Sequence, residues 1–242
     1  IKWLHTPGQN AIFASKNGDI AICDQGEFPA KWFRQGDFVM PGTDSSYAWQ
    51  GMIPQNQNPI MVNPERGFVS SANQLPADSS YPYYLGGNYP PYRGWEINKR
   101  LTEMQNITAQ DMMTLQTDNY NVFGEMAMPV LISNMNVAKL SSQEKSYFEI
   151  LKNWDYRNDA NSRGATLFVV TWDSLTTQVW NDEFQRTGLK LPWPYQSTLL
   201  EDIHKYPHLK FYDDINTPQT ETLQDDITAA FKKAVVTVRK AE

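Results

Sequence analysis

The chain has 242 residues, of which 40% are hydrophobic and 20% charged, a composition typical of a globular protein with its own core. Its net charge is −6 and no basic stripe stands out, which argues against nucleic acid as a partner. No apolar run approaches the roughly 20 residues of a membrane-spanning helix, so no membrane partner is expected, and the single Cys23 excludes an internal disulfide framework.

Strands and turns are predicted for the first third of the chain. Two apolar runs, Asn10–Ala14 and Ile20–Cys23, flank the residues Lys16-Asn17-Gly18-Asp19. Asn-Gly between such runs predicts a β-hairpin with a type I′ turn, which needs positive φ at both central residues. Prolines then recur from residue 29 to residue 64 and predict a loop-rich region without long helices. A further short strand, Phe68–Ala72, is expected to end on Asn73.

Helices are predicted from about Arg93 onward. The first would run to about Gln105, with Trp95, Ile97 and Leu101 along one face. The next begins at an N-cap three residues before an acidic side chain, a pattern typical of a helix start. That pair is Thr108 and Asp111.

Four more helical segments are expected in the second half of the chain. They cover residues 122–131, with an interruption near Pro129, a stretch that begins at Ser141, residues 164–180 and residues 220–239. A strand-rich start followed by helices predicts an α+β fold. We expect residues 1–78 to form the strand-rich part of a core and residues 79–242 the helical region of the same domain.

Several side chains that often carry chemistry are better explained by ordinary structural roles. His204 and His208 have the spacing of a helical zinc pair, but Pro207 lies between them and the acidic partner of such a motif is absent, so we interpret them as surface or cap residues. Cys23 is interpreted as a small buried residue on a strand. Three acidic pairs are interpreted as solvated: Glu201-Asp202, Asp213-Asp214 and Asp225-Asp226.

Aromatic residues are abundant, at 13% of the chain, and many fall in the predicted loops. Such rings either pack the loops against one another, which we favour, or form a platform on which sugars stack. A non-catalytic binding module for carbohydrate or protein therefore stays open as an alternative function. The residues concerned are Trp3, Trp32, Trp49, Tyr81, Tyr83, Tyr84, Tyr89 and Tyr92.

A series of short motifs in a fixed order resembles the penicillin acylase (penicillin amidase) family of N-terminal-nucleophile hydrolases. Each motif alone is weak, but their order and spacing extend over nearly the whole chain. The motifs are Ala14–Ala21, Pro41-Gly42-Thr43 with Trp49-Gln50-Gly51, Asn63–Pro76, Arg93 four residues before Ile97, Gln116-x-Asp118, and Leu151-x-x-Trp154-Asp155 with Ser162 beyond.

The resemblance implies part of an αββα fold and the hydrolysis of linear amide bonds through an acyl-enzyme. In that family an N-terminal Ser attacks the carbonyl group and its own α-amine acts as the base. The match places Asn73 where its side-chain N–H would meet the oxyanion, and Arg93 beside the site, where it would position that Asn. Without the resemblance, the structural alternative for Asn73 is a turn cap, and the alternative for Arg93 is a surface ion pair.

The resemblance also implies that the nucleophile lies in sequence preceding Ile1, so that this chain is an internal piece of a processed precursor, a zymogen, and inactive alone. The expected partners are the remaining parts of that precursor and a small-molecule amide, either a β-lactam side chain or an acyl-homoserine lactone. No cofactor is expected. Some relatives bind calcium, but Leu85 stands near the place of an acidic ligand, so no metal is predicted within this chain.

A periplasmic or secreted location, and a role in antibiotic biosynthesis or resistance, follow from the resemblance alone. A degenerate homologue with a purely structural role is the remaining alternative. It would lack Ser, Thr or Cys at the processing point.

Overall fold

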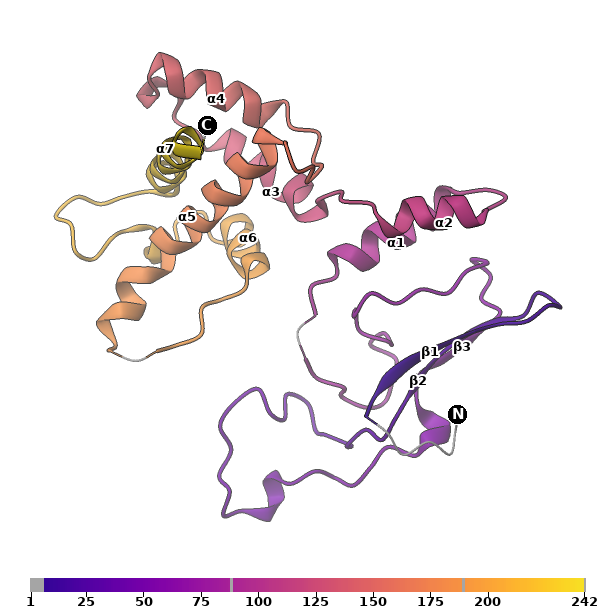
Figure 1. Cartoon of the computed structure of the whole chain (residues 1–242). Helices are drawn as coiled ribbons and strands as arrows, with labels where there is room; N and C mark the ends of the chain where they lie inside the picture. The colour runs from indigo at the N-terminus through magenta and orange to yellow at the C-terminus, as the bar shows by residue number, and fades with distance from the viewer. Residues whose placement is uncertain (1–6, 88, 189, 242) are drawn as a thin grey trace. The chain divides into compact units, whose positions relative to one another are not determined.

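The computed structural model describes residues 7–87, 89–188 and 190–241, and it confirms the α+β class (Figure 1). The chain divides into two compact units, Ile1–Gln116 and Thr117–Glu242. The first unit contains all three described strands and two helices, whereas the second is helical. Among the described residues, no helix combines the length and the apolar composition needed to cross a membrane.

The first unit is built on a three-stranded antiparallel sheet in the order β1-β2-β3 (Figure 1). Its strands are β1 (Gln9–Ala14), β2 (Ile20–Gln25) and β3 (Ile60–Val62). In register, Ile22 of β2 lies opposite a residue of each neighbouring strand, Ile12 of β1 and Met61 of β3. The predicted hairpin is therefore confirmed. Cys23 lies on a strand, β2, as expected, but it is half-buried and not buried.

The turn of this hairpin differs from the predicted type I′ turn. Gly18 has a φ of +92°, but Asn17 is not in the positive-φ region. The Gly18 N–H donates to the carbonyl of Ser15, as in a three-residue loop that ends on a left-handed glycine. The reason is the Ser15 hydroxyl, which accepts from the backbone N–H groups of Asn17 and Asp19 and thereby shapes the loop from within.

Residues 26–59 form a long connection with two short 3₁₀ helices, η1 (Ser45–Tyr47) and η2 (Gln55–Gln57). Backbone bonds tie its two sides together: the Ala30 N–H donates to Gly51 and the Ile53 N–H to the carbonyl of Phe28. Ile53 is almost fully buried, so the loop has a small core of its own.

Two helices complete the first unit, α1 (Tyr92–Glu103) and α2 (Ala109–Gln116). The predicted N-cap is confirmed, because the Thr108 hydroxyl and backbone N–H both bond to Asp111. The predicted face of α1 is only partly right. Leu101 is buried, but Trp95 is half exposed, and the buried side instead includes Gly94 and Glu96, the latter paired with a cation one turn on.

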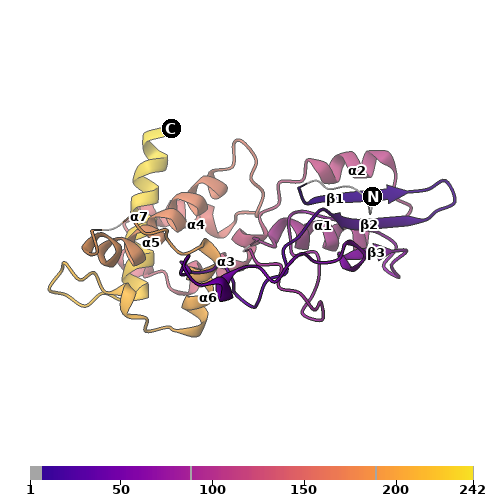
Figure 2. The same cartoon turned by 90° about the horizontal axis from the view of Figure 1, so that it is seen from below.

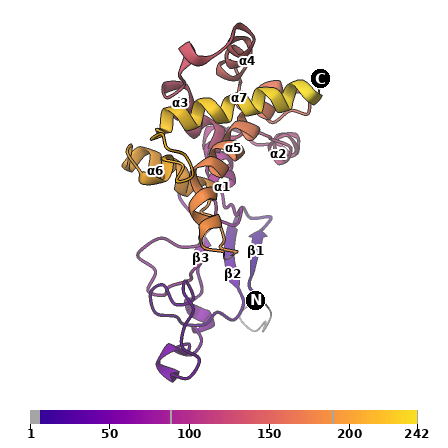
Figure 3. The same cartoon turned by 90° about the vertical axis from the view of Figure 1, so that its left-hand side faces the viewer.

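The described residues of the second unit form five helices and two short 3₁₀ helices. They are α3 (Val122–Ser133), η3 (Val137–Lys139), α4 (Ser142–Lys152), α5 (Arg163–Arg186), α6 (Gln196–Lys205), η4 (Lys210–Tyr212) and α7 (Leu223–Ala241). Helices α5 and α7 pack most extensively, and both Figure 2 and Figure 3 show them lying against each other. Trp172 of α5 and Phe231 of α7 are fully buried and belong to the core.

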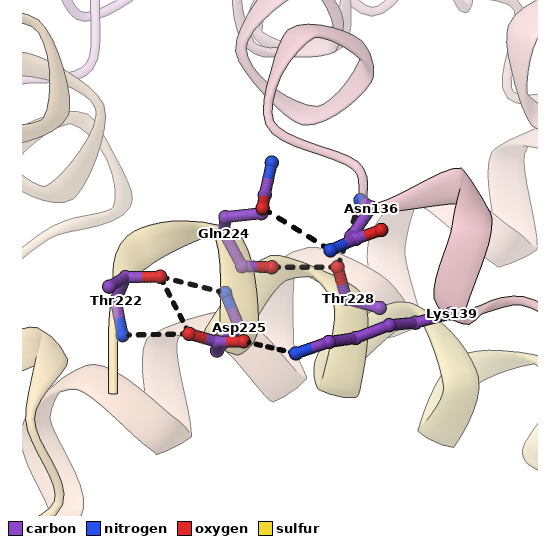
Figure 4. Close-up of polar contacts among 6 residues, drawn as sticks. All are labelled: Asn136, Lys139, Thr222, Gln224, Asp225 and Thr228. Atoms are coloured by element: carbon purple, nitrogen blue, oxygen red, sulfur yellow. Dashed lines mark hydrogen bonds and ion pairs between the residues drawn. The ribbon is translucent and has the colours of Figure 1, made fainter. Parts of the chain in front are cut away.

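The start of α7 is fixed by side-chain bonds that Figure 4 shows. The Thr222 hydroxyl donates to the Asp225 carboxylate at 2.7 Å, and Lys139 of η3 pairs with the same carboxylate at 2.7 Å. One turn on, the Thr228 hydroxyl accepts from the backbone N–H of Asn136 at 3.1 Å. These contacts hold η3 against the N-terminal end of α7 (Figure 4).

Three expectations for this unit need correction. Helix α3 continues through Pro129, which removes only one backbone donor, so the predicted interruption is absent. Helix α6 was not expected; it buries Leu199, Leu200 and Ile203 on one side. Asp226 is not solvated but only 7% exposed, on helix α7, which packs against α5.

Candidate functional site

Asn73 lies in the first unit, in an exposed turn after an extended segment. Its φ is +63°, a left-handed conformation that Asn tolerates better than most residues. The expected strand over Phe68–Ala72 is not formed; the described strands end at Val62. Side chains take the backbone groups that a strand ladder would use: Arg66 donates to the carbonyl of Phe68, for example, at 3.0 Å.

Arg93 stands in the first turn of α1 and reaches back to Asn73. Its Nη2 donates to the Asn73 Oδ1 at 2.8 Å. The structure therefore brings together the two residues that the sequence singled out. Both side chains are exposed. Because Oδ1 is occupied, the amide is oriented with its Nδ2 donor directed elsewhere, and no bond from Nδ2 occurs among the residues that the structure describes.

Further side-chain bonds fasten the residues before Asn73 to neighbouring elements. The Ser70 hydroxyl donates to Asn98 of α1 at 2.8 Å. The Ser71 hydroxyl accepts from Asn10 of β1 at 2.6 Å. Both serine hydroxyls are thus bonded to asparagine side chains, an arrangement without the activating base that a serine nucleophile requires.

An open cleft of about 740 Å³ lies beside this turn. Ser70, Ser71 and Gln74 line it, and the strand residues Ile22 and Asp24 form part of its wall. Burial raises the pKa of the Asp24 carboxyl above its usual value. The cleft reaches the residues on both sides of Asn73, but neither Asn73 nor Arg93 is among those that line it.

Two further residues belong to this arrangement and were missed from the sequence. Gln74 bonds to the backbone just before Asn73, and Gly94 of α1 packs against the Gln74 side chain. No local pattern indicates a role for Gln74. Gly94 offers a weak signal, because a glycine inside a helix is unfavourable and often marks a close approach.

The other side chains tested from the sequence do not gather into a site. His204 and His208 are both exposed, one at the end of α6 and one in the following turn. Among the described residues, no group of three or more His, Cys, Asp or Glu side chains is arranged to hold a metal ion.

The loop aromatics mostly pack against one another in edge-to-face pairs, which favours loop packing over a sugar-stacking platform. Trp3 lies outside the described residues. The pairs are Trp32 with Tyr47, Phe33 with Tyr84, Tyr81 with Tyr83, and Tyr92 with Trp95.

Comparison with known proteins decides which family this arrangement belongs to. The family model described as penicillin amidase matches residues 1–242, the whole chain. The chain belongs to the penicillin amidase family. The resemblance drawn from the short motifs is thereby confirmed.

Curated members of the penicillin amidase family align with most of this chain. Penicillin acylase 2 proenzyme of Pseudomonas sp. (strain SE83) is 25% identical over 171 residues, which are 70% of this chain and 22% of that protein. Penicillin G acylase of Escherichia coli is 26% identical over 165 residues, 65% of this chain and 19% of that protein. Acyl-homoserine lactone acylase QuiP of Pseudomonas aeruginosa is 24% identical over 232 residues, 88% of this chain and 27% of that protein.

The fold is also that of a solved penicillin amidase. The thermostable penicillin G acylase of Alcaligenes faecalis superposes with a TM-score of 0.64 and 17% identity, over 96% of this chain and 47% of that chain. At this identity the likeness concerns the fold. The chain spans less than half of that structure and, at most, 27% of the curated relatives above.

Proposed function

We propose that this chain is the oxyanion-binding part of a penicillin-acylase-like amidohydrolase that cleaves linear amide bonds. In this proposal the Nδ2 of Asn73 donates to the carbonyl oxygen of the substrate as negative charge develops on it. Arg93 holds the amide in the orientation that makes this possible. Such a fixed donor stabilises the transition state because it needs no reorganisation when the charge appears.

The contact between Arg93 and Asn73 carries the proposal. A turn-capping Asn would bond to nearby backbone, whereas the Asn73 oxygen accepts from a side chain 20 residues away. The bond occupies the acceptor and leaves the donor end of an exposed amide directed away from the cation. Membership in the penicillin amidase family supports the same role.

The attacking group is proposed to lie on another part of a longer protein. We infer an N-terminal Ser, exposed by processing of a precursor, with its own α-amine as the general base. An α-amine suits that role because its reference pKa is about 8. The hydroxyl adds to the carbonyl carbon, the amine product leaves with the proton, and water then hydrolyses the ester. No cofactor takes part in this scheme.

For the substrate, we propose small amides whose amine part is a β-lactam nucleus or a homoserine lactone. The names of the aligned relatives support both classes, since they include penicillin acylases and an acyl-homoserine lactone acylase. A periplasmic or secreted location is proposed from the family resemblance alone. The partners are the substrate and the remaining parts of the precursor.

The test compares the longer protein that contains this chain with this chain by itself. Each is assayed with penicillin G, a chromogenic phenylacetyl amide and an N-acyl-homoserine lactone. We expect the longer protein to hydrolyse at least one of them, with the acyl group trapped on its processed N-terminal residue, as mass spectrometry would detect. We expect no turnover by the chain alone.

Two outcomes would contradict the proposal in different ways. Turnover by the chain alone would show that the nucleophile lies within it. A processed longer protein that hydrolyses none of the amides, or that lacks Ser, Thr or Cys at the processed end, would favour the degenerate homologue. Glycan binding by titration calorimetry without hydrolysis would favour the binding-module alternative.

A further inference from the structure

Gln74, the residue after Asn73, folds its side chain back over the turn. Its Oε1 accepts from the backbone N–H of Ala72 at 2.6 Å, and its Nε2 donates to the carbonyl of Ser70 at 3.4 Å. The side chain thus bonds to the backbone on both sides of Ser71, immediately before the exposed Asn73. These are backbone groups that a β-strand would otherwise pair with a neighbouring strand.

The same side chain rests on the first turn of α1. A Cβ atom placed on Gly94 would lie 3.2 Å from the Gln74 Oε1 and 3.3 Å from its Cδ, so any other residue there would require the Gln74 side chain to shift by a few tenths of an ångström. Gly94 is buried and stands next to Arg93. Since glycine inside a helix costs roughly 1 kcal/mol relative to alanine, a close approach of this kind is a physical reason for its presence.

We propose that Gln74 is a positioning residue for Asn73. Its amide sets the shape of the turn, and its contact with Gly94 seats the turn on the part of α1 from which Arg93 reaches the Asn73 oxygen. The catalytic consequence rests on the proposed function, because it requires Asn73 to be the oxyanion donor. The structural consequence, that Gln74 fixes the Arg93–Asn73 contact, does not.

Loss of this side chain should loosen the turn without unfolding the unit. Gln74 is only half-buried, and the bond between the Ser70 hydroxyl and Asn98 would still attach the turn to α1. Ala72 is only 6% exposed, so its N–H would lose its acceptor away from water, at a cost of about 1–3 kcal/mol. The orientation of Asn73, by contrast, depends on the shape of the turn that the Gln74 side chain sets.

The structural test uses Gln74→Ala and Gln74→Glu in this chain, with Glu103→Gln on the exposed side of α1 as the control. The readout is the side-chain amide signal of Asn73 in ¹⁵N–¹H NMR spectra. We expect Gln74→Ala to shift that signal and abolish its cross-relaxation with the Arg93 guanidinium. Gln74→Glu retains the acceptor for Ala72 and should retain much of the wild-type spectrum. Both variants should remain folded, with Gln74→Ala melting below the control because the buried Ala72 N–H loses its acceptor.

The functional test measures kcat and KM of Gln74→Ala in the longer protein. We expect kcat to fall about tenfold, the usual effect of losing one well-placed hydrogen bond, with KM within about twofold of wild type. Gly94→Ala, which pushes on the Gln74 amide without removing it, should shift kcat in the same direction but less. Gln74→Glu should recover most of the wild-type kcat.

The two tests separate this inference from the proposed function. If the wild-type longer protein hydrolyses no amide, the proposed function fails and the NMR spectra still decide whether Gln74 fixes the contact. An unchanged Asn73 signal, or a kcat of Gln74→Ala within twofold of an active wild type, would overturn the positioning role. If Gln74→Ala does not fold, Gly94→Ala decides: an Asn73 signal and a kcat unchanged from wild type in that variant would overturn the positioning role.

Discussion

The Nη2 of Arg93 and the Oδ1 of Asn73 lie 2.8 Å apart, although 20 residues separate them along the chain. The bond joins the first turn of α1 to an exposed turn with a left-handed backbone. It fixes which end of the Asn73 amide can donate to a ligand. The proposed chemistry follows from this orientation, since an oxyanion requires a donor that is already in place.

Removal of the Arg93 guanidinium should lower activity far more than stability. In the longer protein we expect Arg93→Ala to reduce kcat about tenfold, because the Asn73 amide loses the donor that orients it. Arg93→Lys should recover little, since an ammonium group lacks the planar fork of a guanidinium. The melting temperature should change little, because exposed polar contacts contribute roughly 0–1 kcal/mol.

Lys99→Ala on the same helix is the matched control, since it also removes an exposed cation from α1. Its kcat should stay near the wild-type value. Equal losses of kcat in Arg93→Ala and Lys99→Ala would mean that general charge, and not the contact with Asn73, sets the effect.

The second unit should lose stability as the pH rises. Asp226 is 7% exposed, and burial, followed by the charges of Glu221, Asp225, Asp182 and Asp214, raises the pKa of its carboxyl to about 8. The folded state therefore favours the protonated form. The stability that depends on the protonated Asp226 carboxyl is fully present below the unfolded-state pKa near 4, and it is lost as the pH rises toward 8.

Asp226→Asn tests this dependence, since the amide has the shape of the protonated acid. We expect wild type and variant to melt at similar temperatures at pH 4, and the variant to be more stable at pH 8.5 by on the order of 3 kcal/mol. Asp225→Asn is the control: bonds from Lys139 and Thr222 lower the pKa of that carboxyl, so its loss should destabilise at pH 8.5. Parallel melting curves for Asp226→Asn and wild type across this range would contradict the account.

Trp154 is enclosed between two helices by a pair of glycines. A Cβ on Gly164 of α5 would lie 2.6 Å from the Trp154 Cβ, and one on Gly124 of α3 would lie 2.7 Å from the far edge of the indole. Either Gly→Ala substitution should lower the free energy of unfolding by about 2 kcal/mol, through overpacking.

The sign of the change is diagnostic, because Gly→Ala inside a helix otherwise stabilises by roughly 1 kcal/mol. Denaturant unfolding of each variant measures it. Stabilisation by either substitution would show that the indole can move aside and that the two helices are not held at this spacing.

The sequence predicted the elements whose signals are local. The N-cap at Thr108, the helix start at Ser141 and the hairpin of β1 and β2 each depend on residues a few positions apart, and all three are present. The prediction of a type I′ turn from Asn17-Gly18 was wrong because the Ser15 side chain supplies hydrogen bonds that this two-residue pattern does not take into account. The prediction that Asp226 is solvated was wrong because helix α7 packs against α5, which lies far away in sequence.

The candidate site depended on more than local pattern. Asn73 and Arg93 were found through the family resemblance, since neither residue type at its position indicates chemistry by itself. The expected strand before Asn73 failed because the Gln74 side chain bonds to the backbone there, an arrangement that β propensity cannot anticipate. Gln74 and Gly94 became visible only when α1 and the turn were seen together.

One measurement tests the central claim most directly: the kcat of Asn73→Gly in the longer protein. Glycine accepts the φ of +63° without strain, so this variant keeps the turn and removes only the amide. We predict a kcat about 10²–10³-fold below wild type, with KM and the melting temperature nearly unchanged. A kcat within fivefold of wild type would contradict the assignment of Asn73 as the oxyanion donor.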